Sequence, residues 1–366
     1  MENPTRFFLH IPHPNSFQVY FPQLWEDPEF LWWFTQRHRL LLHRGEIKKS
    51  SGSSLPERIG QQMVIYQHQN SQRNLLQIAE TVHIAQACQT RGVSILALKG
   101  PVLSQLLYGS PDQRFSKDLD FACRFEDRKA VTQILVSLGY QPEIDMDTLT
   151  PLKQAICSQA DHHFKFSHPR KKVILELHVE NIQRRYYLDL LIDELFQRSQ
   201  TIAFLDTPIR TLSLMDYALY LSAHGLWHSW FRLKWMLDMV KMEQLITEEQ
   251  RNSLFEKAER CGQSRSVASG MILCHRFFQT PLFPWAETMM KTDPAIPRLV
   301  DYCTEQILDA NPFARKSFAF FIKHQLPSRF SLKKGWDYVL KKFFFDSLNL
   351  SAFAHSRYPD ILFPIY

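Results

Sequence analysis

The sequence predicts an α+β protein in which a small mixed sheet is preceded and followed by helices. Three observations predict this class. Short apolar runs alternate with helical repeats between residues 93 and 140, and two alternating runs joined by a turn follow at 161–180. From about residue 212 onward, the apolar spacing is typical of helices. With 366 residues, 45% of them hydrophobic, the chain is long enough for more than one domain.

We expect three parts. An N-terminal helical segment and linker occupies residues 1–60, the α+β core occupies 61–205, and a C-terminal helical domain occupies 206–366. The first boundary follows the polar, Ser/Gly-rich stretch IKKSSGSSLPERIG at 47–60. Helices are also expected at 27–44 and 61–91, and Gly92 is placed to end the second.

The core begins with VSILALKG at 93–100, a short apolar run that predicts a buried strand. A short helix at 101–109 starts with Pro and ends with Gly, as helices tend to do. DLDFACRF at 118–125 predicts the next strand, and an amphipathic helix follows at 126–140. In the later hairpin, Glu176 and His178 share the face opposite Leu175 and Leu177.

Asp118 and Asp120 stand one residue apart in the predicted strand at 118–125. Alternate side chains of a strand point to the same face, so the two carboxylates would be neighbours. Two neighbouring anions repel each other, and burying them is unfavourable unless a cation compensates. The pair therefore indicates either a solvated face or a site for a cation.

The order of these elements resembles the nucleotidyltransferase fold of the DNA polymerase beta superfamily. More narrowly, ALKGPVLSQLLYGSPDQRFSKDLDF and the later ILELHVE resemble a family of mostly uncharacterised nucleotidyltransferases with an lKG…Y…R…D-x-D pattern and a later E-L-H strand. A His followed by an R-x-x-W-x-x-D-like run in that family is similar to SAHGLWHSWFRLKWMLDMVKM. The resemblance covers residues 70–245 well and the rest loosely. It implies a polymerase-beta-like core with a small mixed sheet, N-terminal helices and a C-terminal helical lobe.

The resemblance also implies roles for individual residues. The catalytic and metal-binding residues would be Asp118, Asp120 and Glu176. The residues that contact the nucleotide would be Lys99, Gly100, Arg114, Lys117 and His178. One alternative remains for Glu176, which could instead pair with a cation of the Lys171/Lys172 turn. The Lys before Gly100 departs from the Gly-Ser or Gly-Gly of the wider superfamily.

The implied reaction is transfer of an NMP from an NTP, with ATP as the expected donor and Mg²⁺ or Mn²⁺ as the cofactor. The implied acceptor is a small molecule, a peptide or a protein in a biosynthetic pathway. Two alternatives stay open: a non-catalytic NTP- or partner-binding module, antitoxin-like or regulatory, and a nucleic-acid-directed nucleotidyltransferase. The net charge of +6, without a dense basic stripe, disfavours nucleic acid as a partner.

Six scattered cysteines without a C-x-x-C spacing predict reduced thiols and a cytoplasmic protein. The sequence contains no run of 18 uncharged apolar residues, so we expect no membrane span. His224 and His228, four residues apart, could share zinc or belong to a helical lobe that lines the substrate cleft, with Arg232 and Asp238 as contacts. His162 and His163 would point to opposite faces of a strand, which argues against a metal site there.

Two aromatic segments have more than one interpretation. The stripe Trp227, Trp230, Phe231 and Trp235 is interpreted as core, with a base-stacking surface as the alternative. The basic and aromatic segment at 313–346 is interpreted as packed helices with solvated basic faces, with binding of nucleic acid or peptide as the alternative.

Overall fold

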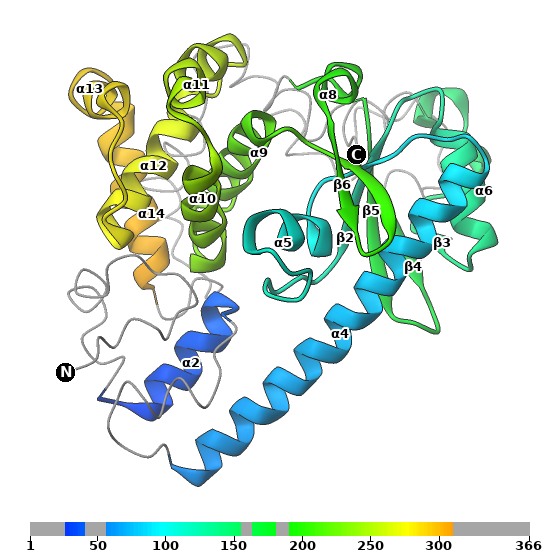
Figure 1. Cartoon of the computed structure of the whole chain (residues 1–366), viewed down its shortest axis with the longest axis horizontal. Coiled ribbons are helices and arrows are strands. Elements are labelled where there is room, and N and C mark those ends of the chain that lie inside the picture. Colours follow the sequence, from blue (N-terminus) through cyan, green and yellow to red (C-terminus); the bar gives the residue numbers. More distant parts are fainter. Residues whose placement is uncertain (1–25, 41–55, 155–162, 181–189, 310–366) are drawn as a thin grey trace. The chain divides into compact units, whose positions relative to one another are not determined.

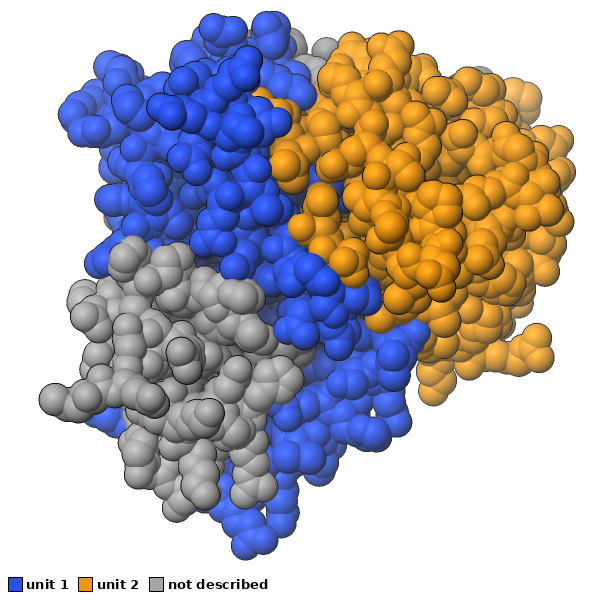
Figure 2. All heavy atoms as spheres, viewed as in Figure 1, with its two compact units in different colours: residues 1–75, 107–115, 217–332 blue, residues 76–106, 116–216, 333–366 orange. Residues whose placement is uncertain are grey.

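The computed structural model describes residues 26–40, 56–154, 163–180 and 190–309. These residues fall into two compact units (Figure 2). Unit 1 contains the described residues up to Leu75, residues 107–115 and the described residues from Tyr217 onward. Unit 2 contains the described residues of 76–106 and 116–216. Residue 162 and the segment 313–346 lie outside the described residues, and the three-part division at 60 and 205 stays a prediction.

The described part of unit 2 is built on a seven-stranded mixed sheet with the order β3-β4-β5-β2-β1-β7-β6. β2 and β5 are parallel, as are β1 and β7, and the other neighbours are antiparallel. The strands are β1 (Leu96–Ala97), β2 (Leu119–Cys123), β3 (Gln141–Pro142), β4 (His163–His168), β5 (Val173–Val179), β6 (Gln200–Phe204) and β7 (Thr207–Thr211). The predicted α+β class with a small mixed sheet is confirmed.

The helices of unit 2 alternate with these strands (Figure 1). They are the C-terminal part of α4 (Glu57–Thr90), most of α5 (Gly100–Tyr108), α6 (Arg128–Ser137), the 3₁₀ turn η3 (Met146–Thr148) and α8 (Ile192–Arg198). The predicted helices at 61–91, 101–109 and 126–140 are therefore present with shifted ends. The predicted strand at 93–100 is shorter than expected, because the chain leaves the sheet after Ala97 and enters α5 at Gly100.

One apolar core lies between the helices and the sheet of unit 2. Cys88 of α4, Leu135 of α6, Phe121 of β2 and Leu175 of β5 are all buried in it. Leu175 and Leu177 of β5 belong to this core, as the alternating pattern predicts. That placement sends the intervening Glu176 to the other face of the sheet.

Unit 1 is helical in its described part. It contains α2 (Pro28–His38), the first part of α4, most of α9 (Leu214–Trp227), α10 (Leu233–Leu245), α11 (Glu248–Arg260), α12 (Ser264–Phe278), α13 (Pro284–Thr292) and α14 (Ala295–Leu308). α12 is buried along most of its length and packs against α10, α11, α13 and α14 (Figure 1). The predicted helix at 27–44 is confirmed in its first half as α2, and residues 41–44 lie outside the described residues.

The segment 213–242 forms two helices rather than one continuous helix, with a break between α9 and α10. Ser229 and Trp230 adopt left-handed backbone angles there, with φ of 52° and 49°. The Trp230 side chain is fully buried, and a Cβ at Gly225 or Gly270 would lie 2.4 or 2.9 Å from its ring. The indole packed against these two glycines holds the strained turn in place, so Trp230 is core, as predicted.

In the part of the chain that the structure describes, no helix is both long enough and apolar enough to cross a membrane.

Candidate active site

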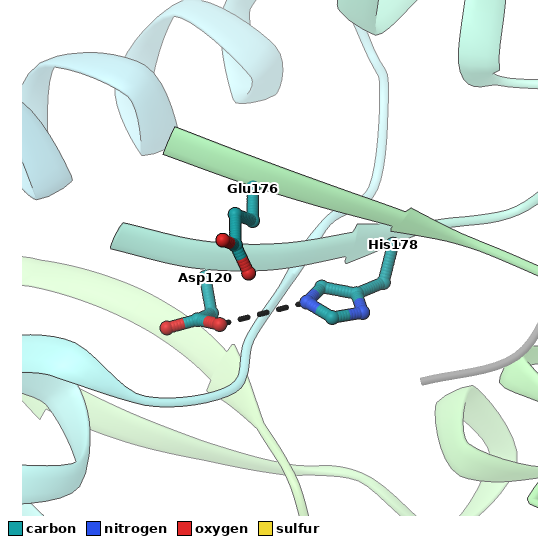
Figure 3. A group of neighbouring side chains, drawn as sticks. All are labelled: Asp120, Glu176 and His178. Atoms are coloured by element: carbon teal, nitrogen blue, oxygen red, sulfur yellow. Dashed lines mark ion pairs between the residues drawn. The ribbon is translucent and has the colours of Figure 1, made fainter. Parts of the chain in front are cut away.

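Three polar side chains converge on adjacent parallel strands of unit 2. Asp120 on β2 is the register partner of Glu176 on β5, and Ala122 is the partner of His178. Figure 3 shows Glu176 and His178 projecting from one strand toward Asp120 on the next. One ligand atom from each of the three residues lies within 4.8 Å of the others. The predicted meeting of Asp120 with an acid on a neighbouring strand is therefore present.

The site is largely shielded from water. Asp120 is 3% exposed and His178 is 6% exposed, while Glu176 is partly buried. Asp120 lies in the interior of the sheet, because β2 is flanked by β5 on one side and β1 on the other. A carboxylate in such a position is stable only with a compensating charge or several hydrogen bonds.

Lys99 supplies part of that compensation. β1 runs antiparallel to β2, and the Leu98 amide donates a hydrogen bond of 2.9 Å to the Asp120 carbonyl. The next residue is Lys99, whose Nζ lies 2.9 Å from Asp120 Oδ1. Gly100 follows with φ of +69°, a conformation that glycine adopts without strain, and it begins α5. The K-G pair thus turns the chain out of the sheet beside Asp120.

The two carboxyl groups of the site titrate in opposite directions. Burial alone would raise the pKa of Asp120, but Lys99 and His178 outweigh it and hold that pKa well below its usual range. Burial raises the pKa of Glu176, and the negative charge of Asp120 raises it further. The positive groups near Glu176 thus compensate for its burial and for the charge of Asp120 only in part.

Two residues of β4 lie opposite these side chains. The ring of His163 lies 5.7 Å from that of His178, its register partner. Lys165 is the register partner of Glu176, but its ammonium binds Glu143 at 2.8 Å. Sequence reasoning did not include His163 in the site. The signal that could have found it is the hairpin register, which places His163 directly opposite His178.

The remaining predicted residues are more scattered. Asp118 directly precedes β2, is partly buried, and accepts a 3.0 Å hydrogen bond from Ser116 Oγ through its backbone oxygen. Lys117 is exposed. Asp118 does not belong to the cluster of three, and the roles expected for it and for Lys117 stay predictions.

Arg114 belongs to unit 1, where its Nε donates to both carboxylate oxygens of Asp238 at 2.9 Å. The Tyr108 hydroxyl donates to the same carboxylate at 3.0 Å. Arg114 and Asp238 are both buried. The structure therefore shows Arg114 and Asp238 bound to each other. The nucleotide contact expected of Arg114 stays a prediction, as does the substrate contact expected of Asp238.

The family model of an uncharacterised nucleotidyltransferase matches residues 26–279 of the sequence. This match covers well over half of the chain and includes every residue of the site. The chain belongs to this family of nucleotidyltransferases. It is therefore an enzyme that moves a nucleotidyl group from an NTP to an acceptor, and the resemblance identified from the K-G, D-x-D and E-L-H elements is confirmed.

Two solved structures are similar to parts of this nucleotidyltransferase. One is ANT(2")-Ia in complex with adenylyl-2"-tobramycin, at 15% identity and a TM-score of 0.35, with 50% of this chain and 98% of that chain covered. The other is an antigenic nucleotidyltransferase-like protein from Paracoccidioides brasiliensis, at 18% identity and a TM-score of 0.30, with 50% and 88% covered. Scores at this level carry no argument about activity or acceptor. No curated protein matches the chain.

The residues of the nucleotidyltransferase site fit a divalent cation. Asp120 Oδ1 and His178 Nε2 are buried and lie 3.5 Å apart, without the alignment of a hydrogen bond (Figure 3). Carboxylate oxygens suit Mg²⁺ and Mn²⁺, whereas imidazole is more typical of Zn²⁺, so Asp120 and Glu176 are the groups that fit Mg²⁺ or Mn²⁺. Among the described residues, Asp120, Glu176 and His178 are the only group of three or more His, Cys, Asp or Glu side chains close enough to share an ion.

The structure gives no support to zinc binding by His224 and His228 or to an ion pair between Glu176 and Lys171. The rings of His224 and His228 lie 4.8 Å apart, and His228 stacks on Trp235 at 5.1 Å. No further His, Cys, Asp or Glu of the described chain completes a metal site with them. Lys171, considered as a partner for Glu176, instead binds Glu80 at 2.6 Å.

Proposed function

We propose that this nucleotidyltransferase is catalytically active and transfers AMP from ATP to a small molecule, a peptide or a protein, with Mg²⁺ or Mn²⁺ as the cofactor. The observation that carries the proposal is the convergence of Asp120, Glu176 and His178 within 4.8 Å. A protein that only binds a partner has no physical need to hold two carboxylates together in a shielded site. The non-catalytic alternative is therefore disfavoured.

The proposal gives each group a role. Asp120 and Glu176 hold the divalent ion, with Asp118 as a further carboxylate at the entry of β2. A divalent ion held there would neutralise charge on the phosphates. His178 lies against Asp120 and orients its carboxylate. Gly100 begins α5, and the free N–H groups of a helix N-terminus favour a phosphate.

The cationic residues expected to contact the nucleotide belong to the same proposal. Lys99 and the exposed Lys117 would meet the phosphates, and Arg114 would do so only if its pair with Asp238 opened. The modest net charge of +6 supports an acceptor other than nucleic acid. The five described cysteines form no disulfide, which is compatible with the proposed cytoplasmic location.

Label transfer tests the proposal. Purified protein is incubated with each of the four [α-³²P]NTPs and Mg²⁺ or Mn²⁺, with and without cell extract as a source of acceptors. We expect label from ATP on one acceptor, and its loss in Asp120→Asn and Glu176→Gln. The matched control is Lys165→Met, which removes a charge whose ammonium binds Glu143 instead of the cluster.

Each other outcome has a defined meaning. Transfer that persists in Asp120→Asn would remove that carboxylate from the mechanism. Transfer of label from another NTP would show that this NTP, and not ATP, is the donor. Binding of NTP without any transfer to any acceptor would favour the non-catalytic module.

A further inference from the structure

The ammonium of Lys99 lies where a cation bound to Asp120 would lie. Its Nζ is 2.9 Å from Asp120 Oδ1, and the two side chains are 12% and 2% exposed. The contact is an ion pair without the alignment of a hydrogen bond, since Asp120 Oδ1 has no hydrogen-bonded partner. Asp120 Oδ1 therefore faces two positive or polar groups, Lys99 Nζ at 2.9 Å and His178 Nε2 at 3.5 Å.

We propose that Lys99 is an exchangeable counter-ion. It neutralises Asp120 in the metal-free enzyme and is displaced when a divalent ion binds, after which its ammonium pairs with the phosphates of the NTP. This inference rests on the proposed function and adds to it a competition between Lys99 and the metal for the same carboxylate oxygen. It predicts that metal and nucleotide bind cooperatively.

Electrostatic repulsion makes the two cations compete for Asp120. Mg²⁺ and Mn²⁺ bind carboxylate oxygens at roughly 2.1 Å. An ammonium that stayed 2.9 Å from the same oxygen would lie close to the ion, in surroundings where charges are weakly screened. Metal binding therefore favours displacement of Lys99, and the cost of the lost ion pair lowers the affinity of the empty site for metal.

The local chain offers the ammonium a second partner. Lys99 is followed by Gly100, which begins α5, and a helix N-terminus favours a phosphate. The long, flexible lysine side chain can turn from the carboxylate toward such an anion. A bound triphosphate then replaces the interaction that the metal removed, so each ligand raises the affinity for the other.

Binding of Mn²⁺ alone, measured by electron paramagnetic resonance of the free ion, tests the competition without any turnover. We expect Lys99→Met to bind Mn²⁺ about tenfold more tightly than the wild type, because its competitor is gone. Lys99→Arg keeps the charge and is expected to bind Mn²⁺ as the wild type does. Lys99→Gln replaces Lys99→Met if the methionine variant does not fold.

Lys165→Met is the matched control for a general effect of charge. The pKa of Lys165 is raised chiefly by its hydrogen bond to Glu143 and to a smaller extent by the charge of Glu176. Its ammonium is thus near the site without occupying it, and its removal is expected to change Mn²⁺ affinity by less than about twofold. An equal gain in Lys165→Met and Lys99→Met would overturn the exchange.

A double-mutant cycle locates the competition at Asp120. In an Asp120→Asn background, Lys99→Met is expected to give no gain in Mn²⁺ affinity. Unchanged or weaker Mn²⁺ binding in Lys99→Met alone would show that Lys99 supports the metal site instead of competing with the metal.

Nucleotide binding tests the second half of the exchange. With Mn²⁺ saturating, the ATP analogue with an α,β-methylene bridge is expected to bind Lys99→Met about tenfold more weakly than the wild type. Unaltered binding would overturn the transfer of Lys99 to the phosphates. The Mn²⁺ and nucleotide binding measurements do not depend on label transfer. An enzyme that fails to transfer AMP could therefore still show the exchange of Lys99, and an active enzyme could lack it.

Discussion

Two buried ion pairs, one in each unit, look alike and differ in what surrounds them. In unit 1, Arg114 donates to both oxygens of Asp238, and the Tyr108 hydroxyl donates to the same carboxylate. In unit 2, Lys99 reaches one oxygen of Asp120 at the same distance of 2.9 Å. The first carboxylate is fully hydrogen-bonded by its neighbours, whereas the second has Glu176 and His178 within 4.8 Å.

The comparison shows which kind of buried charge indicates chemistry. Removing one partner of a satisfied pair such as Arg114–Asp238 is unfavourable, because the other charge stays buried with less compensation. The Asp120 cluster carries a second carboxyl group, Glu176, whose pKa is raised by burial and by the negative charge of Asp120. An excess of negative charge in a shielded place indicates a site for a cation that arrives with the substrate.

The largest expected effect is on activity. Asp120→Asn is expected to lower the rate of AMP transfer by at least about 10³-fold, because the carboxylate central to the cluster is lost. Its free energy of unfolding is expected to fall by only about 1 kcal/mol, since relief of the repulsion with Glu176 partly offsets the lost pairing with Lys99 and His178. Label transfer and urea unfolding measure the two quantities. A large loss of stability together with activity would make Asp120 a structural residue.

The opposite pattern is expected in unit 1. Asp238→Asn is expected to lower the free energy of unfolding by about 3 kcal/mol, because it removes the carboxylate charge that the buried Arg114 binds. Tyr108→Phe, which removes one hydrogen bond to the same carboxylate, is expected to cost about 1 kcal/mol. Urea unfolding gives both values. If Asp238→Asn abolished transfer without loss of stability, the distinction between the two pairs would fail.

Glu243 in unit 1 is a third buried carboxyl group, and it differs from Asp120 and Asp238 in that no ion pair with a cation is seen for it among the described residues. Burial raises the pKa of Glu243 in unit 1 to about 8, despite Thr280 and Arg251. The folded protein then binds a proton that the unfolded chain releases near its ordinary pKa of 4.5. The contribution of Glu243 to stability is therefore fully present below pH 4.5 and is lost as the pH rises to about 8.

Glu243→Gln removes this dependence. Between pH 5 and pH 8, the stability of the variant relative to the wild type is expected to rise by an amount of the order of 2 kcal/mol. Urea unfolding across this pH range measures the difference. A difference that does not change with pH would show that Glu243 is ionised in the folded protein.

The smallest expected effects compare two glycines with positive φ. Gly92 and Gly100 have φ of +68° and +69°, so alanine at either position is expected to lower the free energy of unfolding by about 1 kcal/mol. Only Gly100 follows Lys99 and is the first residue of α5, next to the candidate site. Only Gly100→Ala is therefore expected to slow AMP transfer. Equal activity of the two variants would show that the K-G turn does not set the geometry of the site.

Much of the fold was predictable because the informative patterns are local. The alternation around Glu176 gives the strand and its buried face, and the polar turn before Val173 gives the hairpin. The meeting of Asp120 with Glu176 also followed from the sequence, although through a resemblance and not through periodicity. Sequence periodicity alone does not say that β5 pairs with β2, since strand order depends on long-range packing.

The less predictable features depend on tertiary contacts. The break at Trp230 arises because its indole needs space beside Gly225 and Gly270, which lie on two different helices. The partners of Lys99 and Arg114 are carboxylates distant in sequence, and a long cationic side chain turns toward whichever carboxylate the fold brings near. For the same reason, a D-x-D pattern could not show that Asp120 would join the cluster and Asp118 would not.

The central claim is that the Asp120 cluster is the metal site of this nucleotidyltransferase. It is tested most directly by titrating Mn²⁺ into the wild-type protein and into Asp120→Asn and measuring the free ion by electron paramagnetic resonance. The account predicts saturable Mn²⁺ binding to the wild type and a loss of at least about tenfold in affinity in the variant. Equal affinity of the two proteins for Mn²⁺ would contradict it.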